Sequence, residues 1–153
     1  MSGGFRLGVV LRLREMAEDA ARARLATAVD AHRLVTEELI AHTAAEHEAQ
    51  ARLVTMGEAG AQAGDLRAAL AGVELAEAAT QATRVKLEAV SEALMTARSA
   101  LAEATKRREV VERLRDRIRL LEAQEAQHQE DNQLSEIAGV RHARAISARE
   151  VEP

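Results

Sequence analysis

The fold is decided by residues 66–104, which read LRAALAGVELAEAATQATRVKLEAVSEALMTARSALAEA. Alternating steps of three and four residues along this stretch reach an apolar side chain everywhere except at two threonines. An apolar series with an average spacing of 3.5 residues holds one face of a helix against a partner helix in a left-handed coiled coil. We call this series the downstream seam: Leu66, Ala69, Val73, Ala76, Thr80, Thr83, Leu87, Val90, Leu94, Ala97, Leu101 and Ala104.

The partner of this helix is predicted earlier in the same chain. Residues 5–56 have the same alternating spacing, and the lone proline is the last residue, so nothing interrupts a helix there. Five charged or histidine side chains occupy this upstream seam, which makes it weaker than the downstream one. Its members are Leu7, Leu11, Arg14, Glu18, Ala21, Leu25, Ala28, His32, Val35, Leu39, His42, Glu46, Ala49, Leu53 and Met56.

A glycine-rich turn over residues 57–65, GEAGAQAGD, is expected to join the two helices. Gly57 is predicted to follow the end of the first helix, and Asp65 to cap the start of the second helix, about 66–146. The turn is short enough to return the chain along itself. The sequence therefore predicts an all-α fold in one domain, residues 1–153: an antiparallel two-helix coiled-coil hairpin with an overhanging C-terminal helix.

The register of the hairpin also follows from the sequence. Placing Met56 opposite Leu66 makes a large side chain face a small one in most layers, so that the helices approach closely without voids. The same register places His42 opposite Thr80. Further pairs are Leu53 with Ala69, Ala49 with Val73, Ala28 with Leu94 and Leu25 with Ala97.

The apolar pattern changes after Ala104, where it is predicted to slip by one residue and to continue at the next four apolar positions. Beyond about residue 120 the second helix passes the start of the first, so it is expected to overhang without a partner. Isolated helices are marginal in water, and Gly139 is the expected weak point. The slipped positions are Val111, Leu114, Ile118 and Leu121.

Composition excludes several classes of function. The formal net charge of −4 argues against a general nucleic-acid binder, and the absence of cysteine excludes disulfides. No stretch suits a signal peptide or a membrane span. Nucleophile-elbow and phosphate-loop motifs are missing, so we expect no enzyme and no cofactor. A metal site is not expected either, because His42 and His47 diverge by about 140° on a helix.

A basic run, KRREVVERLRDRIR at 106–119, has a surplus of four positive charges. Pairs such as Arg108 with Glu112 would make it an ordinary solvated helix face. The predicted register, however, places Arg14 opposite Arg108, and facing like charges are destabilising unless Glu18, Glu112 or an external acid offsets them. A solvated face and a partner-binding surface both remain open at this point.

The two ends of the chain resemble the flagellar export protein FliJ family. Residues 5–15, FRLGVVLRLRE, are similar to the family's opening Phe-x-Leu-x-x-Val-Leu-x-x-Arg. The stretch 107–121 leads to QLSEIA at 133–138, which is similar to the family's Leu-Asp-Glu-Ile/Ala segment, with Ser135 where the family often has Asp. The resemblance covers nearly the whole length in architecture and about 40 residues in motif-like identity.

This resemblance implies a non-enzymatic stalk of the flagellar export apparatus. Such proteins associate with a hexameric export ATPase (FliI-like) through the end that bears the termini, reach an export gate protein (FlhA-like) near the hairpin tip, and handle export chaperones. It also implies a cytoplasmic protein peripheral to the cell membrane. The residues expected at the ATPase are Phe5, Leu7, Arg12, Arg107, Arg108, Arg113, Arg117, Leu134, Glu136 and Ile137.

Three alternatives stay open from the sequence. The equivalent stalk of an injectisome-type secretion system is also a coiled-coil hairpin, so the residues do not distinguish it from a flagellar stalk. A lipid-surface helix would need a wide apolar face and a basic polar face, whereas this seam is narrow and the chain acidic. A generic coiled-coil tether would associate in parallel, against the large-on-small antiparallel register.

Overall fold

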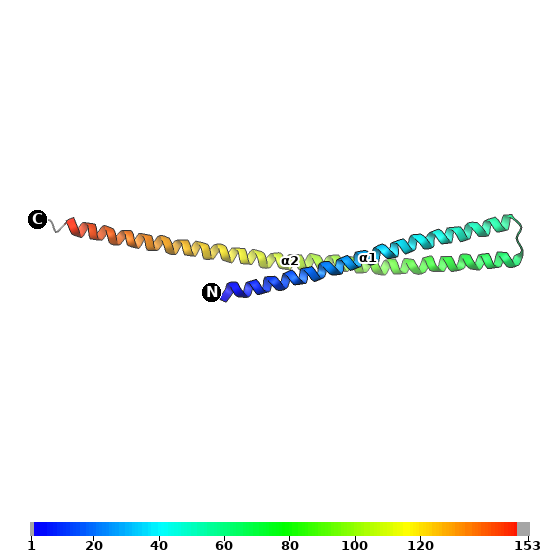
Figure 1. Ribbon diagram of the computed structural model, residues 1–153, viewed down its shortest axis with the longest axis horizontal. Coiled ribbons are helices and arrows are strands. Elements are labelled where there is room, and N and C mark those ends of the chain that lie inside the picture. Colours follow the sequence, from blue (N-terminus) through cyan, green and yellow to red (C-terminus); the bar gives the residue numbers. More distant parts are fainter. Residues whose placement is uncertain (1, 150–153) are drawn as a thin grey trace. The chain divides into compact units, whose positions relative to one another are not determined.

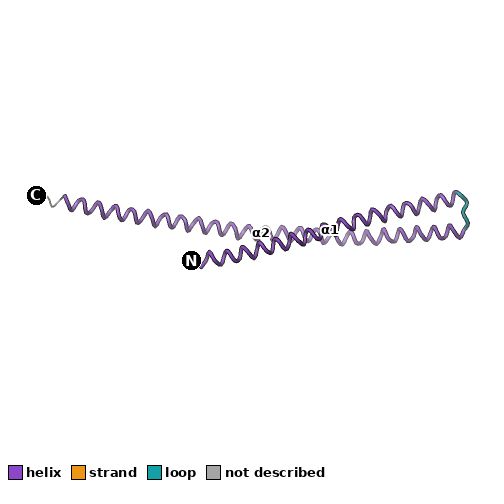
Figure 2. The backbone as a smooth tube through the Cα atoms, viewed as in Figure 1, coloured by secondary structure: helices purple, strands orange, loops and turns teal. Residues whose placement is uncertain are grey.

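The computed structural model describes the backbone of residues 2–149 and the side chains of residues 6–144. It contains two helices, α1 (Ser2–Glu58) and α2 (Ala63–Arg149), joined by one short loop (Figures 1 and 2). No strand occurs within the described part of the chain. The all-α hairpin predicted from the sequence is confirmed. Both helices extend further than predicted, and the connection is correspondingly shorter.

The chain divides into two compact units, which are described separately below. Unit 1 contains residues 1–12 and 107–153, which are the start of α1 and the second half of α2. Unit 2 contains residues 13–106, which include the loop between the helices. Organisation as a single domain stays a prediction.

The end of α1 is fixed by Gly60, whose φ of 70° lies in the left-handed region that glycine adopts without strain. The Ala61 amide donates to the Met56 carbonyl at 3.0 Å, and the Gly60 amide donates to the Gly57 carbonyl at 3.2 Å. These two bonds form a Schellman motif, which satisfies carbonyl groups at the helix end. The prediction that Gly57 follows the helix was wrong: it lies inside α1, because the later glycine provides the turn.

The start of α2 also lies earlier than predicted. The Leu66 amide donates to the Gln62 carbonyl at 3.1 Å, and the helix begins at Ala63. Asp65 is therefore not the N-cap but a residue of the first turn, where its carboxylate still faces the positive end of the helix dipole. A glycine-rich turn over residues 57–65 was expected here, and only the four residues 59–62 lie outside the helices.

The core of unit 2 follows the two predicted seams. Every member of the downstream seam is buried or half-buried, as is every upstream member from Arg14 to Met56. The most buried apolar side chains are Ala21, Val73 and Leu94. Alanine at many of these positions lets the helix backbones approach closely, so the core is a narrow line of contacts rather than a globular interior.

Contacts between α1 and α2 within unit 2 show that the two helices are antiparallel, whereas the exact pairing of seam residues stays a prediction. In a helix, each side chain points back towards the N-terminus of its own helix. In an antiparallel pair, the end of a side chain therefore contacts a residue with a higher number than the one that directly faces its Cα atom. Lys86 accordingly pairs with Glu38 at 2.9 Å, and the Thr105 hydroxyl donates to Glu18 at 3.1 Å. The Gln50 amide donates to Glu77 at 3.4 Å. His42, predicted opposite Thr80, is bonded instead to Thr83, the next seam position.

Two fully buried threonines form a polar layer in the middle of this seam. The Thr83 hydroxyl donates to the Ala79 carbonyl at 3.0 Å and lies 2.8 Å from Nδ1 of His42. The Thr83 hydroxyl has one proton, so its donation to the Ala79 carbonyl leaves the hydroxyl oxygen to accept from an N–H at Nδ1 of His42. The Thr80 hydroxyl is equally buried, yet it has no hydrogen-bond partner among the described residues.

Replacing these two threonines by valine is expected to give opposite results. Thr83→Val removes the acceptor of His42 and should lower the free energy of unfolding by about 1–2 kcal/mol. Thr80→Val removes a hydroxyl that is desolvated without compensation, and should leave stability unchanged or raise it by up to about 1–2 kcal/mol. Thermal and urea unfolding of both variants, followed by circular dichroism, measures the difference. Equal destabilisation by the two changes would contradict the assigned bond.

In unit 1 the helix keeps the phase of the downstream seam beyond Ala104. Val111 and Ile118 are half-buried as predicted, but Leu114 and Leu121 are 47% and 55% exposed. The predicted slip by one residue was therefore wrong at these two leucines. A slip would require a local change of winding. Arginine at a seam position needs no such change, because its long aliphatic stem can pack in the seam. Arg108 and Arg115 occupy those positions and are half-buried.

The second half of α2 continues as a helix to Arg149, through Gly139. Every described side chain from Arg119 to Arg144 is exposed. This part of unit 1 thus has no core of its own, as the predicted overhang requires. The helix ends slightly later than the predicted residue 146.

Candidate partner-binding surface

Unit 1 brings together all ten residues predicted to contact a partner. The described side chains among them are exposed, apart from Leu7 and Arg108, which are half-buried. The backbone of Phe5 is helical, and its side chain lies outside the described side chains. The aliphatic members Leu134 and Ile137 are 65% and 52% exposed. Residues far apart in the sequence therefore belong to one unit, and most of them are available to another molecule.

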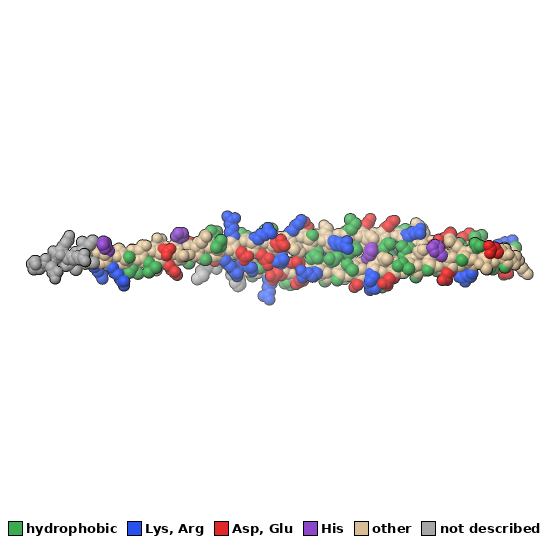
Figure 3. Space-filling model, turned by 90° about the horizontal axis from the view of Figure 1, so that it is seen from above, with side chains coloured by type: hydrophobic (Ala, Val, Ile, Leu, Met, Phe, Trp, Pro, Cys, Tyr) green, Lys and Arg blue, Asp and Glu red, His purple; other side chains and the backbone are tan. Residues whose placement is uncertain are grey.

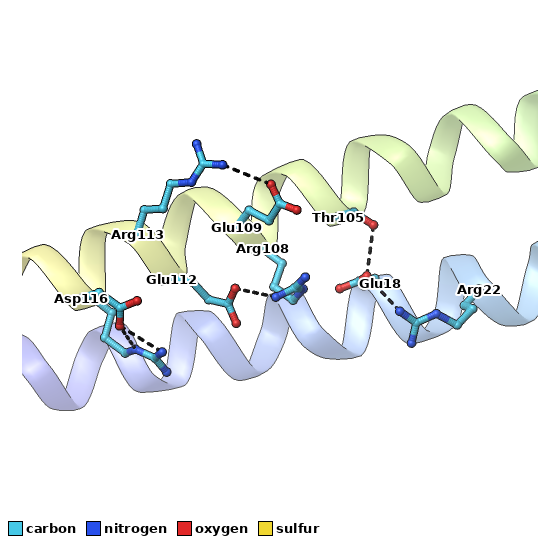
Figure 4. A network of polar contacts seen from close by, with 9 residues as sticks. Glu18, Arg22, Thr105, Arg108, Glu109, Glu112, Arg113 and Asp116 are labelled. Carbon is cyan, nitrogen blue, oxygen red and sulfur yellow. Dashed lines mark hydrogen bonds and ion pairs between the residues drawn. The ribbon is translucent and has the colours of Figure 1, made fainter.

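Part of the basic run is paired along its own helix (Figure 4). Arg108 forms an ion pair and a hydrogen bond with Glu112, and Arg115 donates two hydrogen bonds to Asp116 at 3.2 Å. Arg113 lies 3.5 Å from Glu109, with 81% of its side chain exposed. Such an exposed pair contributes about 0–1 kcal/mol. The charge of Arg108 is offset by Glu112, one of the acids expected from the sequence to do so.

The surplus of positive charge resides on three exposed arginines. Arg107, Arg117 and Arg119 have no hydrogen bond or ion pair among the described residues, whereas four other basic side chains of the run are paired. Arg107 and Arg117 were predicted as contacts. Arg119 was not singled out, although its place in the same run was the available signal.

Glu18, in unit 2, is the buried acid of the upstream seam (Figure 4). Its Oε1 accepts a hydrogen bond from Arg22 at 3.0 Å and another from Thr105 at 3.1 Å. A buried carboxylate is tolerated when charged and hydroxyl donors satisfy it. Glu18 is therefore part of the helix pairing.

The exposed tail of unit 1 carries a shallow groove of about 370 Å³. It includes two predicted contact residues, and mixes aliphatic side chains with charges of both signs. It lies along one face of α2 and is open to solvent. The groove is lined by Glu136, Ile137, Val140, Arg141 and Arg144.

A second groove, in unit 2 near the loop between the helices, was missed from the sequence. It has a volume of about 610 Å³ and is mostly alanine and glycine, with Leu75 74% exposed. The signal that could have found it is the run of small residues beside the downstream seam. Its lining is Ala45, Ala49, Arg52 and Met56 from α1, and Asp65, Ala68, Ala69, Gly72, Leu75, Ala76 and Ala79 from α2.

Other kinds of site were sought across the described residues. No group of three or more histidine, aspartate or glutamate side chains there could hold a metal ion. Within the same part of the chain, no helix has the length and apolarity that a membrane span requires. Basic and acidic side chains are interspersed over the face drawn in Figure 3, without a large field of one sign. Recognition on such a surface depends on individual charges.

Comparison with known proteins identifies the family. A family model described as the flagellar FliJ protein matches residues 2–147. No curated protein and no solved structure matches the chain. The match covers α1, and α2 as far as residue 147, which includes the basic run and the exposed side chains up to Arg144. The chain therefore belongs to the flagellar FliJ family, whose members are coiled-coil proteins associated with flagellar export.

Proposed function

We propose that this chain is a non-enzymatic stalk that couples the hexameric export ATPase to the export gate and its chaperones. In this proposal unit 1 binds the ATPase ring. The loop between the two helices, which belongs to unit 2, reaches the gate. The protein acts in the cytoplasm at the membrane face where the gate lies. The flagellar system is favoured over an injectisome because the matching family model is flagellar.

The observation that carries the proposal is the set of exposed, unpaired arginines in unit 1. Arg107, Arg117 and Arg119 have no ion-pair partner among the described residues, and the side chains that follow Arg119 in α2 are exposed as far as Arg144. Both features favour association with an acidic surface that accepts a helix. A central opening of a ring supplies contacts all around such a helix.

The groove of unit 2 supports the proposed contact with the gate or with chaperones. Small side chains there leave space for a partner's backbone to approach, and Leu75 offers an exposed apolar anchor. Arg52 and Asp65 add one charge of each sign. A groove of this composition suits a helix or loop with an apolar side chain directed into it.

Reconstitution with the purified hexameric ATPase tests the proposal. Addition of the full chain is expected to form a complex by analytical ultracentrifugation and to raise the rate of ATP hydrolysis. The chain alone is expected to hydrolyse no ATP. Absence of both binding and stimulation, with a helical chain by circular dichroism, would contradict the proposed function.

A further inference from the structure

Because α2 keeps the spacing of the downstream seam beyond Ala104, a second line of residues on unit 1 lies outside that seam. We call it the outer stripe. Its members recur at alternating steps of three and four residues, the spacing of a coiled-coil seam. The first four members each lie one position before a half-buried residue of α2. It consists of Arg107, Val110, Leu114, Arg117 and Leu121.

The aliphatic members of the outer stripe are exposed to an unusual degree for side chains at coiled-coil spacing. Val110 is 63% exposed, Leu114 47% and Leu121 55%. The adjacent seam positions, Val111 and Ile118, are half-buried. The same segment of helix therefore presents one apolar line to its own core and another to solvent, and only the first line is used within the chain.

The charges of the outer stripe indicate what would cover it. Arg107 and Arg117 have no ion-pair partner among the described residues. They lie ten residues apart, which is about 15 Å along a helix. Coverage by an apolar surface alone would bury two guanidinium groups without compensation, which is unfavourable. Carboxylates at matching positions would remove that cost.

We propose that the outer stripe binds an acidic amphipathic helix of a partner protein. Leucine-type side chains on that helix pack against Val110, Leu114 and Leu121, and two carboxylates about 15 Å apart pair with Arg107 and Arg117. The complex is a local three-helix coiled coil. This inference goes beyond the proposed function, because it specifies a helix-on-helix contact whether or not the ATPase supplies the helix.

Two other occupants fit the stripe less well. A lipid surface calls for a wide apolar face with basic residues opposite it, whereas here the stripe is narrow and contains its arginines. A second copy of the chain would bring the same two arginines to a self-complementary interface, where like charges would meet. Both remain outcomes of the experiment described next.

A designed peptide provides a defined probe. The fluorescent peptide is about three heptads long, with leucines at alternating three- and four-residue spacing and two glutamates ten residues apart. A second peptide carries lysines in place of the glutamates. Binding to the full-length chain is measured by fluorescence anisotropy, at peptide concentrations where sedimentation shows it monomeric. Circular dichroism verifies that every protein variant keeps its helix content.

Three variants distinguish the outer stripe from general adhesion. Leu114→Gln with Leu121→Gln should weaken binding of the acidic peptide about tenfold or more, since both anchors are lost. The matched control Leu120→Gln removes a neighbouring leucine that is 59% exposed and lies off the stripe, and should bind as the parent does. Arg107→Glu with Arg117→Glu should reverse the preference, so that the lysine peptide binds better.

Several results would overturn the inference. They are failure of the parent chain to bind the acidic peptide, equal weakening by Leu120→Gln, and no change of preference in the Arg107 and Arg117 variant. Leucine-dependent dimerisation of the chain alone would assign the stripe to a second copy. Leucine-dependent binding to vesicles of anionic phospholipid would assign it to a membrane. ATPase binding by the parent, together with no peptide binding, would refute this inference and leave the proposed function standing.

Discussion

Reversal of charge at Arg113 and Arg117 is expected to abolish binding of the chain to the export ATPase and its stimulation of ATP hydrolysis. Arg117 is exposed and unpaired among the described residues, and Arg113 is 81% exposed. Both charges are thus available to an acidic partner. Exchanging two attractions for two repulsions should weaken binding by about a hundredfold or more.

The free chain should tolerate the same reversal. The exposed ion pair of Arg113 with Glu109 contributes only about 0–1 kcal/mol. A matched control is the reversal of Arg84 and Arg98, two exposed arginines of unit 2 without an ion pair among the described residues. That control should bind the ATPase as the parent does. Undiminished binding by the Arg113 and Arg117 variant would reduce the basic run to a solvated helix face.

The largest effect on stability is expected for Leu94→Ala. Leu94 is 8% exposed in the seam of unit 2, and the neighbouring helix cannot collapse fully into the space that a truncated side chain leaves. Loss of a buried leucine should lower the free energy of unfolding by about 2–4 kcal/mol. Urea unfolding followed by circular dichroism at 222 nm measures this change.

Met95→Ala provides the control for Leu94→Ala at the adjacent position. Met95 is 69% exposed and lies off the seam, so its truncation should change stability by less than about 0.5 kcal/mol. Similar losses at the two positions would mean that α2 is not held by a seam of 3.5-residue spacing. The comparison therefore tests the phase of the helix independently of any partner.

Most of the fold could be predicted because one periodic signal specifies it. Leu25 and Leu53 belong to the upstream seam, and Val73 and Leu94 to the downstream seam. Each seam keeps its 3.5-residue spacing, and all four side chains are buried or half-buried in unit 2. Even the polar exceptions behave as seam positions: Glu18 and Thr83 are buried, with partners across the hairpin. The 3.5-residue spacing therefore identifies the seam positions even where the residue is polar or charged.

The details that failed were choices between nearly equivalent alternatives. Gly57 and Gly60 can each end a helix, and only the closure of the turn selects the second. After Ala104 two phases compete, since Val111 and Ile118 belong to both of them. Apolarity favours the pattern that places Leu114 and Leu121 in the seam. A constant helix winding favours the pattern that places Arg108 and Arg115 there. The free-energy cost of changing the helix winding at this point cannot be read from the local sequence.

The sequence predicted which part of the chain contains the candidate site, but not which of its charges are unpaired. Sequence motifs at both ends selected residues that all belong to unit 1. Which arginines are unpaired depends on the rotamers of Glu109, Glu112 and Asp116, and these are settled only in three dimensions. The outer stripe was hidden for a related reason. Its leucines were assigned to the core by their apolarity.

The central claim is that unit 1 is the part of the chain that enters the ATPase ring. Site-specific photo-crosslinking in the reconstituted complex tests it most directly, with a benzoylphenylalanine introduced in place of Arg119 or of Leu75. Both positions are exposed, the first in unit 1 and the second in the groove of unit 2. The account predicts ATPase adducts from position 119 and none from position 75. Adducts from position 75 alone, or equal yields from both, would contradict it.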